Sequence, residues 1–397
     1  MTKEQVFFLQ ILDDHLHGRK SEAPSGLSWE ALAQYAANHE VNGIVFYQCR
    51  AFLPGPVEKR LSEKYTAEIY YYYNRLALFK QVQQGLNAAD IPYFTVKGID
   101  VAPLYPVPAL RTMGDCDIVV HPEDKETAHD IMLSLGFENK LKEGIEWNYF
   151  KNDLEFELHD HLLYEFSVND SASVQGMDEA WAYTQPAGEG TRRVLDWSFH
   201  FVFLLLHLKK HLVGSGAGFR QFLDLAAVAR KQELDWDWIR KTLEDLELLD
   251  FARVCAGLME RWFAVALPLD APQPEEAFYD EATQKIFNNG IFGFHDESNR
   301  ENETISTFVQ DRGPRWLIRL RRLLRSAFPP YRNIRYGTHY GFLNGRPWLL
   351  PAAWIYRFYR SIRYRMGARG KKMLGHAFIP AETLDERRRE LEKWGLQ

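Results

Sequence analysis

The chain has few of the residues that mark secreted, zinc-binding or membrane-spanning proteins. Its 3 cysteines, Cys49, Cys116 and Cys255, are far apart in the sequence. They offer neither a disulfide framework nor a zinc motif, so we expect a reducing compartment and a cytoplasmic location. The N-terminal segment has acidic residues close behind a short apolar stretch and no cleavage-site pattern, which is unlike a signal peptide. No apolar run approaches the ~20 residues that span a bilayer, and we expect no transmembrane segment.

A strong charge of either sign is also absent. The formal net charge is -6, with 46% hydrophobic and 26% charged residues, which is the balance of a soluble globular protein. The whole-molecule charge therefore gives no argument for binding nucleic acid or an anionic membrane. The 397 residues allow two or three domains, or one core with helical additions.

Helical periodicity fills the N-terminal part of the chain. The stretch "TKEQVFFLQILDDHL" has apolar residues at helical spacing, and Ser28 is a suitable N-cap for "WEALAQYAANHE". A long helix is predicted from about Pro56 to "NAAD", and we expect its four tyrosines at 70–73 to pack around a core. We therefore predict an N-terminal helical region over residues 1–90.

The pattern changes after residue 90. Two short β-prone runs, "IPYFTVKG" and "CDIVV", are followed by an amphipathic helix with Pro122 near its start. The turn-like "KND" then separates two further strand-like runs, which indicates a hairpin. We predict an α/β core over residues 91–175 and, because helical periodicity returns and holds, a helical region over 176–397. The expected fold class is α+β within a mostly α-helical chain.

Two carboxylates stand at the start of the second β-prone run, "RTMGDCDIVV". In a strand, alternate side chains share a face, so Asp115 and Asp117 point the same way. Carboxylates this close repel each other unless water reaches both or a cation lies between them. The pair therefore indicates either a solvated strand end or a site for a hard cation such as Mg²⁺. The pair alone does not decide between these interpretations.

The run "LEFELHDH" supplies a third carboxylate. Its leucines and phenylalanine share one face, whereas Glu155, Glu157 and His159 share the other. An ordinary solvated edge strand has the same pattern. If this strand pairs beside "GDCDIVV", however, Glu157 joins Asp115 and Asp117. Three carboxylates around Mg²⁺ suit phosphoryl or nucleotidyl transfer, in which one carboxylate also takes a proton from the attacking hydroxyl.

Cations and glycine lie close by in the sequence. Lys97 and Gly98 form a strand-to-helix turn, where glycine lets a phosphate approach backbone N–H groups and lysine adds positive charge. Arg111 lies four residues before Asp115 and is placed to reach the same phosphates.

These segments together resemble a known family. The line "VKGIDVAPLYPVPALRTMGDCDIVV", then an amphipathic helix and "LEFELHDHLL", is similar to the uncharacterised nucleotidyltransferase family of the polymerase-β-type superfamily. That family has a Lys-Gly turn, a Tyr-Pro segment, Arg-x-x-Gly-Asp-x-Asp and a later Asp-Leu-His strand. The resemblance continues through "LLLHLKKHLVGSGAGFRQFLDLA" and reaches "FPPYRNIRYG" near the end of the chain.

The resemblance implies a small mixed sheet with helices on one side, a nucleoside triphosphate donor such as ATP, and Mg²⁺, with Mn²⁺ as the alternative ion. By position, Asp115 and Asp117 would be metal ligands, and Glu157 would stand where the family has aspartate. Within the same motifs, Lys97, Gly98, Arg111 and Gly114 would bind the nucleotide. Lys97 and Gly98 replace the Gly-Ser of better-known superfamily members. This change and the longer Glu157 leave open a degenerate protein that only binds.

The helical part adds further candidates in "HLKKHLVGSGAGFRQFLDL". A triphosphate needs more cations than Lys97 and Arg111 supply, so Lys210 and Arg220 are candidate phosphate ligands. Arg220 and Asp224 at i, i+4 are equally suited to a structural ion pair. His207 and His211 share a helix face; we favour hydrogen bonding over metal binding for them, because no zincin-type Glu follows. 

Residues 312–372 carry well over a dozen Arg and Lys, with no Asp or Glu, interleaved with Trp and Tyr. This composition suits RNA or an anionic lipid head group, but the same arginines can pair with acidic residues elsewhere in the chain, which we favour. The polar, unpatterned segment 295–304 is expected to be a surface loop or mobile segment.

The sequence thus predicts a cytoplasmic Mg²⁺-dependent nucleotidyltransferase that transfers a nucleoside monophosphate to a hydroxyl or phosphate acceptor. The acceptor classes that fit are a small metabolite, a sugar phosphate, a protein hydroxyl and an RNA end. The alternative is a non-catalytic nucleotide-binding or partner-binding module with the same fold. A metal-dependent glycosyltransferase using Asp-x-Asp is disfavoured, because no larger nucleotide-binding domain precedes the motif.

Overall fold

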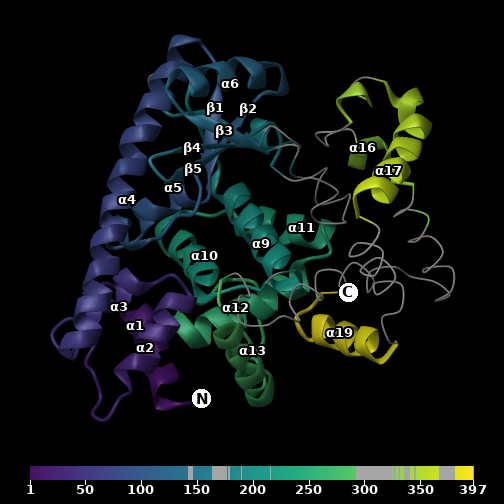
Figure 1. Cartoon of the computed structure of the whole chain (residues 1–397). Helices are drawn as coiled ribbons and strands as arrows, with labels where there is room; N and C mark the ends of the chain where they lie inside the picture. The colour runs from purple at the N-terminus through teal and green to yellow at the C-terminus, as the bar shows by residue number, and fades with distance from the viewer. Residues whose placement is uncertain are drawn as a thin grey trace.

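The computed structural model describes residues 1–141, 146–162, 177, 179–188, 190–214, 216–291, 324, 328–329, 331–334, 340–343, 346–365 and 381–396. Small sheets lie among many helices (Figure 1), which confirms the α+β prediction. The segment expected to be a loop, 295–304, lies outside the described residues, as does part of the basic region 312–372. Within the described residues, none of the helices has the length and apolar content needed to cross a membrane.

Residues 1–90 contain four helices, α1 (Lys3–Leu16), α2 (Trp29–Asn38), α3 (Asn42–Cys49) and α4 (Gly55–Ala88). The sequence analysis identified all of them but α3. The Ser28 hydroxyl accepts a hydrogen bond from the Ala31 N–H and caps α2, and Pro56 lies in the first turn of α4. The expected packing of the four tyrosines is wrong, because Tyr70 and Tyr73 are 63% and 62% exposed. Those two side chains lie on the solvent face of a helix that is buried on its other side.

The α/β core holds a five-stranded mixed sheet in the order β1–β2–β5–β4–β3. Strands β2 and β5 run parallel and all the other neighbours antiparallel. The bounds are β1 (Tyr93–Val96), β2 (Asp117–Val120), β3 (Glu138–Leu141), β4 (Glu146–Lys151) and β5 (Leu154–His159). The predicted hairpin is β4–β5, and β3 was not predicted. The sequence analysis expected Glu157 to join Asp115 and Asp117 only if these two strands pair, and β2 does pair with β5.

Helices cover both faces of the β1–β2 half of the sheet, so the expectation of helices on one side is wrong. Ile118 and Val120 pack in one hydrophobic cluster with α4 and α6 (Lys125–Ser134). Val119 and Phe94 pack in another cluster with residues of α9 (Trp197–Val213). The physical reason lies in the sequence: "YFTV" and "IVV" are apolar at successive positions, which is typical of strands that are buried on both faces.

The C-terminal region is mostly helical, with one interruption that the sequence analysis missed. Its longer helices are α9, α10 (Phe219–Lys231), α11 (Trp236–Asp245), α12 (Leu249–Phe263), α13 (Glu276–Asn289), α17 (Leu350–Arg365) and α19 (Ala381–Lys393). Strands β6 (Thr184–Pro186) and β7 (Arg193–Leu195) form a hairpin where helix was expected. Gly188 and Gly190 allow it, because both take positive φ angles, 85° and 88°.

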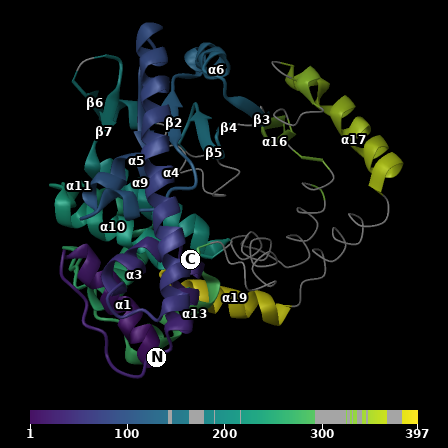
Figure 2. The same cartoon turned by 60° about the vertical axis from the view of Figure 1, so that its left-hand side comes forward.

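Short elements complete the described chain: α5 (Gly98–Val101) and α16 (Tyr331–Ile334), with 3₁₀ turns η1 (Ala102–Leu104), η2 (Pro108–Leu110), η3 (Pro122–Asp124), η4 (Glu179–Tyr183), η5 (Gly341–Leu343) and η6 (Pro347–Leu349). One hydrophobic cluster joins α1–α3 with α9, α10, α12 and α13, so the helices before and after the sheet share a core. Figure 2 shows α4 running from those helices up to the sheet. The domain boundaries at 90 and 175 stay a prediction.

The shared core contains a buried histidine that makes stability sensitive to acid. His39 contacts Phe8, Phe219 and Phe287, and burial lowers its pKa to about 3. The pKa of histidine in an unfolded chain is about 6.5, so below that pH the unfolded chain binds a proton that the folded chain does not bind. Stability from this group is therefore full above about pH 6.5. It falls as the pH drops, by up to about 1.4 kcal/mol per pH unit.

We expect His39→Phe to flatten the fall in the free energy of unfolding between pH 6.5 and 5, whatever its effect at neutral pH. Urea unfolding at a series of pH values measures the slope. An unchanged slope would contradict the assignment of the proton to His39.

Candidate functional site

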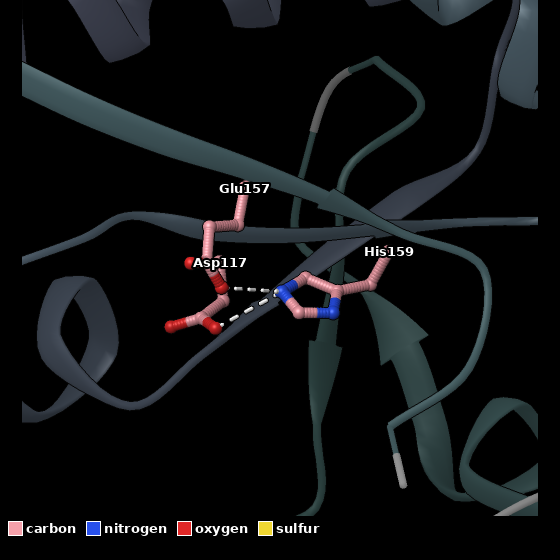
Figure 3. A group of neighbouring side chains, drawn as sticks. All are labelled: Asp117, Glu157 and His159. Atoms are coloured by element: carbon pink, nitrogen blue, oxygen red, sulfur yellow. Dashed lines mark ion pairs between the residues drawn. The ribbon is translucent and has the colours of Figure 1, made fainter. Parts of the chain in front are cut away.

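Three side chains that can ligate a cation converge where β2 and β5 pair. Asp117 and Glu157 are direct Cα partners across the parallel strands, and His159 lies two residues further along β5. One ligand atom of each lies within 4.8 Å of the others. His159 Nε2 is 3.1 Å from Asp117 Oδ1 and 3.2 Å from Glu157 Oε2, and Figure 3 shows the imidazole pointing at both carboxylates. Asp117 and His159 are buried, and Glu157 is half-buried.

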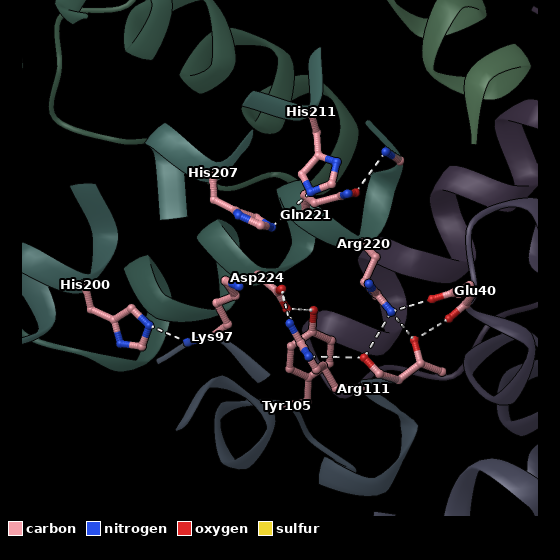
Figure 4. Close-up of polar contacts among 12 residues, drawn as sticks. Glu40, Lys97, Tyr105, Arg111, His200, His207, His211, Arg220, Gln221 and Asp224 are labelled. Atoms are coloured by element: carbon pink, nitrogen blue, oxygen red, sulfur yellow. Dashed lines mark hydrogen bonds and ion pairs between the residues drawn. The ribbon is translucent and has the colours of Figure 1, made fainter. Parts of the chain in front are cut away.

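Lys97 completes the cluster from the end of β1. Its Nζ lies 2.6 Å from Asp117 Oδ1. Its backbone has φ 57° and ψ -123°, which is strained for a residue with a side chain. The Lys97 N–H donates a hydrogen bond to His200 Nε2 at 2.9 Å, so α9 holds this strained turn in place (Figure 4). Burial lowers the pKa of His200 to about 4, which keeps the imidazole a neutral acceptor.

Burial and charge compete within the cluster. Burial disfavours every charge, yet Asp117 raises the pKa of Lys97, and Lys97 with His159 holds the pKa of Asp117 well below its usual range. Burial would likewise lower the pKa of His159, but the two carboxylates raise it to about 9. The pKa of Glu157 is raised, first by burial and then by Asp117 and Asp115, against the opposing effect of His159. Two cationic groups therefore face two carboxyl groups out of bulk water.

The cluster fits a divalent cation. Asp117 Oδ2 is buried and has no hydrogen-bond partner within the described part of the chain. A buried carboxylate oxygen without a partner calls for an explanation, and a bound cation would supply one. The donor set of two carboxylates and an imidazole is one that binds divalent metals in proteins.

Asp115 lies near this cluster but is not one of its three members. The carboxylate is half-buried, and its charge acts on Lys97 and Glu157. The loop before it is held by Arg75 of α4, whose guanidinium donates to the carbonyls of Met113 at 2.8 Å and Gly114 at 2.9 Å. The structure thus places Gly114 in a loop that presents Asp115 at the edge of the site. 

Arg111 occupies a buried ion pair. Its Nη2 lies 2.6 Å from Asp224 Oδ2 and its Nε donates to Asp224 Oδ1 at 3.1 Å, while the Tyr105 hydroxyl donates to the same Oδ1 at 2.7 Å (Figure 4). Burial would lower the pKa of Arg111, but Asp224 raises it. A Cβ on Gly98 would lie 2.5 Å from Arg111 Nη1, so glycine here lets the Arg111 guanidinium pass close to the backbone. 

Arg220 and Lys210 differ in how they are held. Arg220 Nη1 lies 2.6 Å from Glu40 Oε2 and donates to the Thr112 hydroxyl at 2.8 Å, so the i, i+4 pair with Asp224 does not form. Lys210 is exposed on α9. His207 and His211 lie with their Nε2 atoms 3.0 Å apart, which supports the hydrogen-bonded interpretation. Burial lowers the pKa of His207, and the charges of Lys97, Lys210 and Arg220 lower it further. 

Sequence reasoning did not select four residues that the structure places at or beside the candidate site. His159 carried a signal, because it shares the acidic face of β5 with Glu157. Tyr105 stands in the Tyr-Pro segment of the family pattern, but nothing in the sequence indicated its partner Asp224, 119 residues away. His200 and Arg75 carried no signal, because their partners lie 103 and 38 residues away. Each depends on long-range packing rather than on local spacing.

Comparison with known proteins identifies the family. No match was found among curated proteins or among solved structures. The model of the family described as "Uncharacterised nucleotidyltransferase" matches residues 25–264, which include the sheet, the acidic cluster, α9 and α10. The resemblance noted near "FPPYRNIRYG" lies beyond this match and stays a prediction. The chain belongs to the uncharacterised nucleotidyltransferase family.

Proposed function

We propose that this protein is a Mg²⁺-dependent nucleotidyltransferase that moves a nucleoside monophosphate from a nucleoside triphosphate, ATP in the first instance, to a hydroxyl or phosphate acceptor. The observation that carries the proposal is the pairing of Asp117 with Glu157 across β2 and β5, with Lys97 Nζ beside Asp117. Asp117 Oδ2 is buried and has no hydrogen-bond partner among the residues that the structure describes. Family membership supports the reaction class.

The acidic residues would hold the cation and handle the proton. Asp117 and Glu157 would be ligands, with Asp115 joining them from the adjoining loop, and Mn²⁺ is the alternative ion because His159 adds a nitrogen donor. When bound, the metal neutralises triphosphate charge and aligns the reacting phosphate. The raised pKa of Glu157 suits this residue to accept the proton of the acceptor hydroxyl.

The basic residues would bind the triphosphate to different extents. Lys97 is already at the cluster and can exchange its contact with Asp117 for a phosphate oxygen. Lys210 is exposed on α9, and its charge acts on His207, as does that of Lys97. Arg220 is half-buried. Arg111 would have to leave Asp224 to touch a phosphate, so its direct role is the weakest part of the nucleotide-binding assignment.

A catalytically degenerate binding module is the second candidate. It is favoured by the contacts of Lys97 and His159 with Asp117, because two protein cations already neutralise the carboxylates that a metal would bind. Such a protein would bind nucleotide without turnover.

One experiment separates the two candidates. ATP labelled at the α-phosphate is incubated with the full chain, Mg²⁺ and a panel of small hydroxyl metabolites, sugar phosphates, proteins and RNA. We expect pyrophosphate release and transfer of the label, both lost when EDTA removes Mg²⁺ and restored by Mn²⁺. ATP bound without pyrophosphate on the whole panel would support the binding module. Transfer of a γ-label instead would contradict nucleotidyl transfer.

A further inference from the structure

A side chain of α19 caps the C-terminal end of α9. The last four backbone carbonyls of an α-helix have no partner within that helix. Arg387 supplies a partner for two of them, because its Nη2 donates to the Leu212 carbonyl at 3.2 Å and to the Val213 carbonyl at 2.9 Å. The two carbonyls before them, of Lys210 and His211, accept hydrogen bonds from backbone N–H groups of the following loop. Half of the cap on α9 therefore comes from a distant part of the chain.

Arg387 is itself held in place. Its side chain is 5% exposed, and its Nη1 lies 2.5 Å from Glu390 Oε2, while Lys285 of α13 contacts the other oxygen of Glu390. Trp394 anchors the end of α19 on α13, because its ring packs edge-on against Phe278 with 5.7 Å between the ring centres. Figures 1 and 2 show the two helices side by side. Burial lowers the pKa of Arg387 to about 10, so at neutral pH the guanidinium keeps the positive charge that suits a helix C-terminus.

The loop after α9 is rich in glycine. Three of the five residues at 214–218 are glycine, which has no side chain that could hold the end of the helix. Gly216 has a φ angle of 105°, which a residue with a side chain rarely adopts. The exposed Lys210, a proposed triphosphate ligand, lies in the last turn before this loop. Its position depends on whether that turn stays helical, because helix ends fray when their carbonyls lack partners.

The cap bears on the triphosphate site through Lys210. The charges of Lys97 and Lys210 both lower the pKa of His207, so the two lysines act on the same region of the site. Lys97 Nζ lies 2.6 Å from Asp117 Oδ1, at the candidate cation site. A triphosphate that both lysines hold needs their ammonium groups at a fixed separation, and a displacement of about 1 Å can cost a hundredfold in rate. The end of α9 must therefore be held still for the two lysines to act together.

We propose that Arg387 is a positioning residue of the triphosphate site, which holds Lys210 in place by capping α9. The inference rests on the proposed function, because it takes a nucleoside triphosphate as the ligand. The family model matches residues 25–264, so α19 lies outside the match. Part of the nucleotide affinity of this chain would thus depend on a helix that the family match does not include.

A double-mutant cycle on ATP affinity tests the proposal in the full chain with Mg²⁺, and isothermal titration calorimetry measures the dissociation constant. Lys210→Met should weaken ATP binding about tenfold, because one ammonium–phosphate contact is lost. Arg387→Met should weaken it about fivefold, because Lys210 is then held less well. If Arg387 acts through Lys210, adding Arg387→Met to Lys210→Met should change the dissociation constant by less than about twofold.

Two further variants separate positioning from general damage. Arg387→Lys keeps the charge and can donate to the same carbonyls, so it should restore ATP affinity to within about threefold. Arg388→Gln is the matched control, because Arg388 is the next residue on α19, is 49% exposed and pairs with Asp385 of its own helix. It should bind ATP as the unchanged chain does. Mn²⁺ binding at the Asp117 cluster, followed by electron paramagnetic resonance, should be the same in all variants. If Arg387→Met does not fold, the shorter and uncharged Arg387→Gln takes its place with the same expectations.

Three results would overturn the positioning role. They are ATP affinity that is unchanged in the Arg387 variants, an equal loss in Arg388→Gln, and a loss that adds in full to that of Lys210→Met. Full additivity would mean that Arg387 affects ATP binding by a route other than Lys210. Absence of pyrophosphate release by the unchanged chain would contradict the proposed reaction alone, because the cycle measures ATP binding and still decides the positioning role. An unchanged chain that binds no ATP would overturn both.

Discussion

Replacing Asp117 by Asn is expected to reduce nucleotidyl transfer by about a thousandfold. Asp117 contacts Lys97 and His159, and its Oδ2 is buried with no hydrogen-bond partner within the described part of the chain. The amide would remove both the negative charge and the proposed cation ligand. Loss of metal assistance to a phosphoryl group costs several kcal/mol of transition-state stabilisation, and each 1.36 kcal/mol is tenfold in rate. Pyrophosphate release with Mg²⁺ measures the effect. Mn²⁺ binding, followed by electron paramagnetic resonance, reports the cation site without any acceptor.

The matched control is Glu155→Gln, two residues before Glu157 on the same face of β5 but outside the group of three residues that could hold a cation. It should leave both readouts within about twofold. Because Asp117→Asn also leaves Lys97 and His159 facing a neutral amide, its melting temperature must be compared at the same pH. A folded Asp117→Asn variant that still binds Mn²⁺ and still turns over would contradict the assignment of the cation site.

The acidic cluster was predicted in part from the local sequence. Alternation along "LEFELH" predicted that Glu157 and His159 share a face opposite Leu158, and β5 has this arrangement. The alternation of side chains along a strand does not show which strand pairs with it. The parallel pairing of β2 with β5 decides that Glu157 faces Asp117, and it follows from how both strands pack against α4 and α6. The prediction that Glu157 lies beside Asp117 therefore depended on the pairing of β2 with β5, and the structure has this pairing.

The ion pairs of the arginines could not be predicted from the sequence. Spacing suggested an i, i+4 pair between Arg220 and Asp224, yet each takes a partner more than a hundred residues away in sequence, Glu40 and Arg111 respectively. An i, i+4 pair stabilises an isolated helix by only about 0.2–0.5 kcal/mol. Burial against other elements outweighs that amount, because a buried charge without a partner costs several kcal/mol. Local spacing therefore predicts ion pairs poorly where helices pack together.

The buried pair of Arg111 and Asp224 should account for the largest stability effect of a single substitution in this region. Arg111→Met leaves the Asp224 carboxylate buried with only the Tyr105 hydroxyl, and Asp224→Leu leaves a buried guanidinium without its carboxylate. Each should lower the free energy of unfolding by about 3–5 kcal/mol, whereas the double variant should recover much of it because the buried charges are removed together. Urea unfolding measures all three. Arg220→Met is the control, since its partner Glu40 is half exposed and the loss should be about 1 kcal/mol.

The double variant also decides whether Arg111 binds the triphosphate. If Arg111 acts only through Asp224, by holding the loop of Met113 against the turn at Gly98, then restoring stability should restore ATP affinity to within a few fold. If Arg111 instead contacts a phosphate, ATP affinity should stay low in the double variant, although the protein is stable again. Asp224→Asn adds an independent readout, because releasing the guanidinium would then strengthen ATP binding rather than weaken it. From the distances of 2.6 and 3.1 Å to Asp224, we expect recovery in the double variant and no gain in Asp224→Asn. Arg111 would then be a positioning residue of the site.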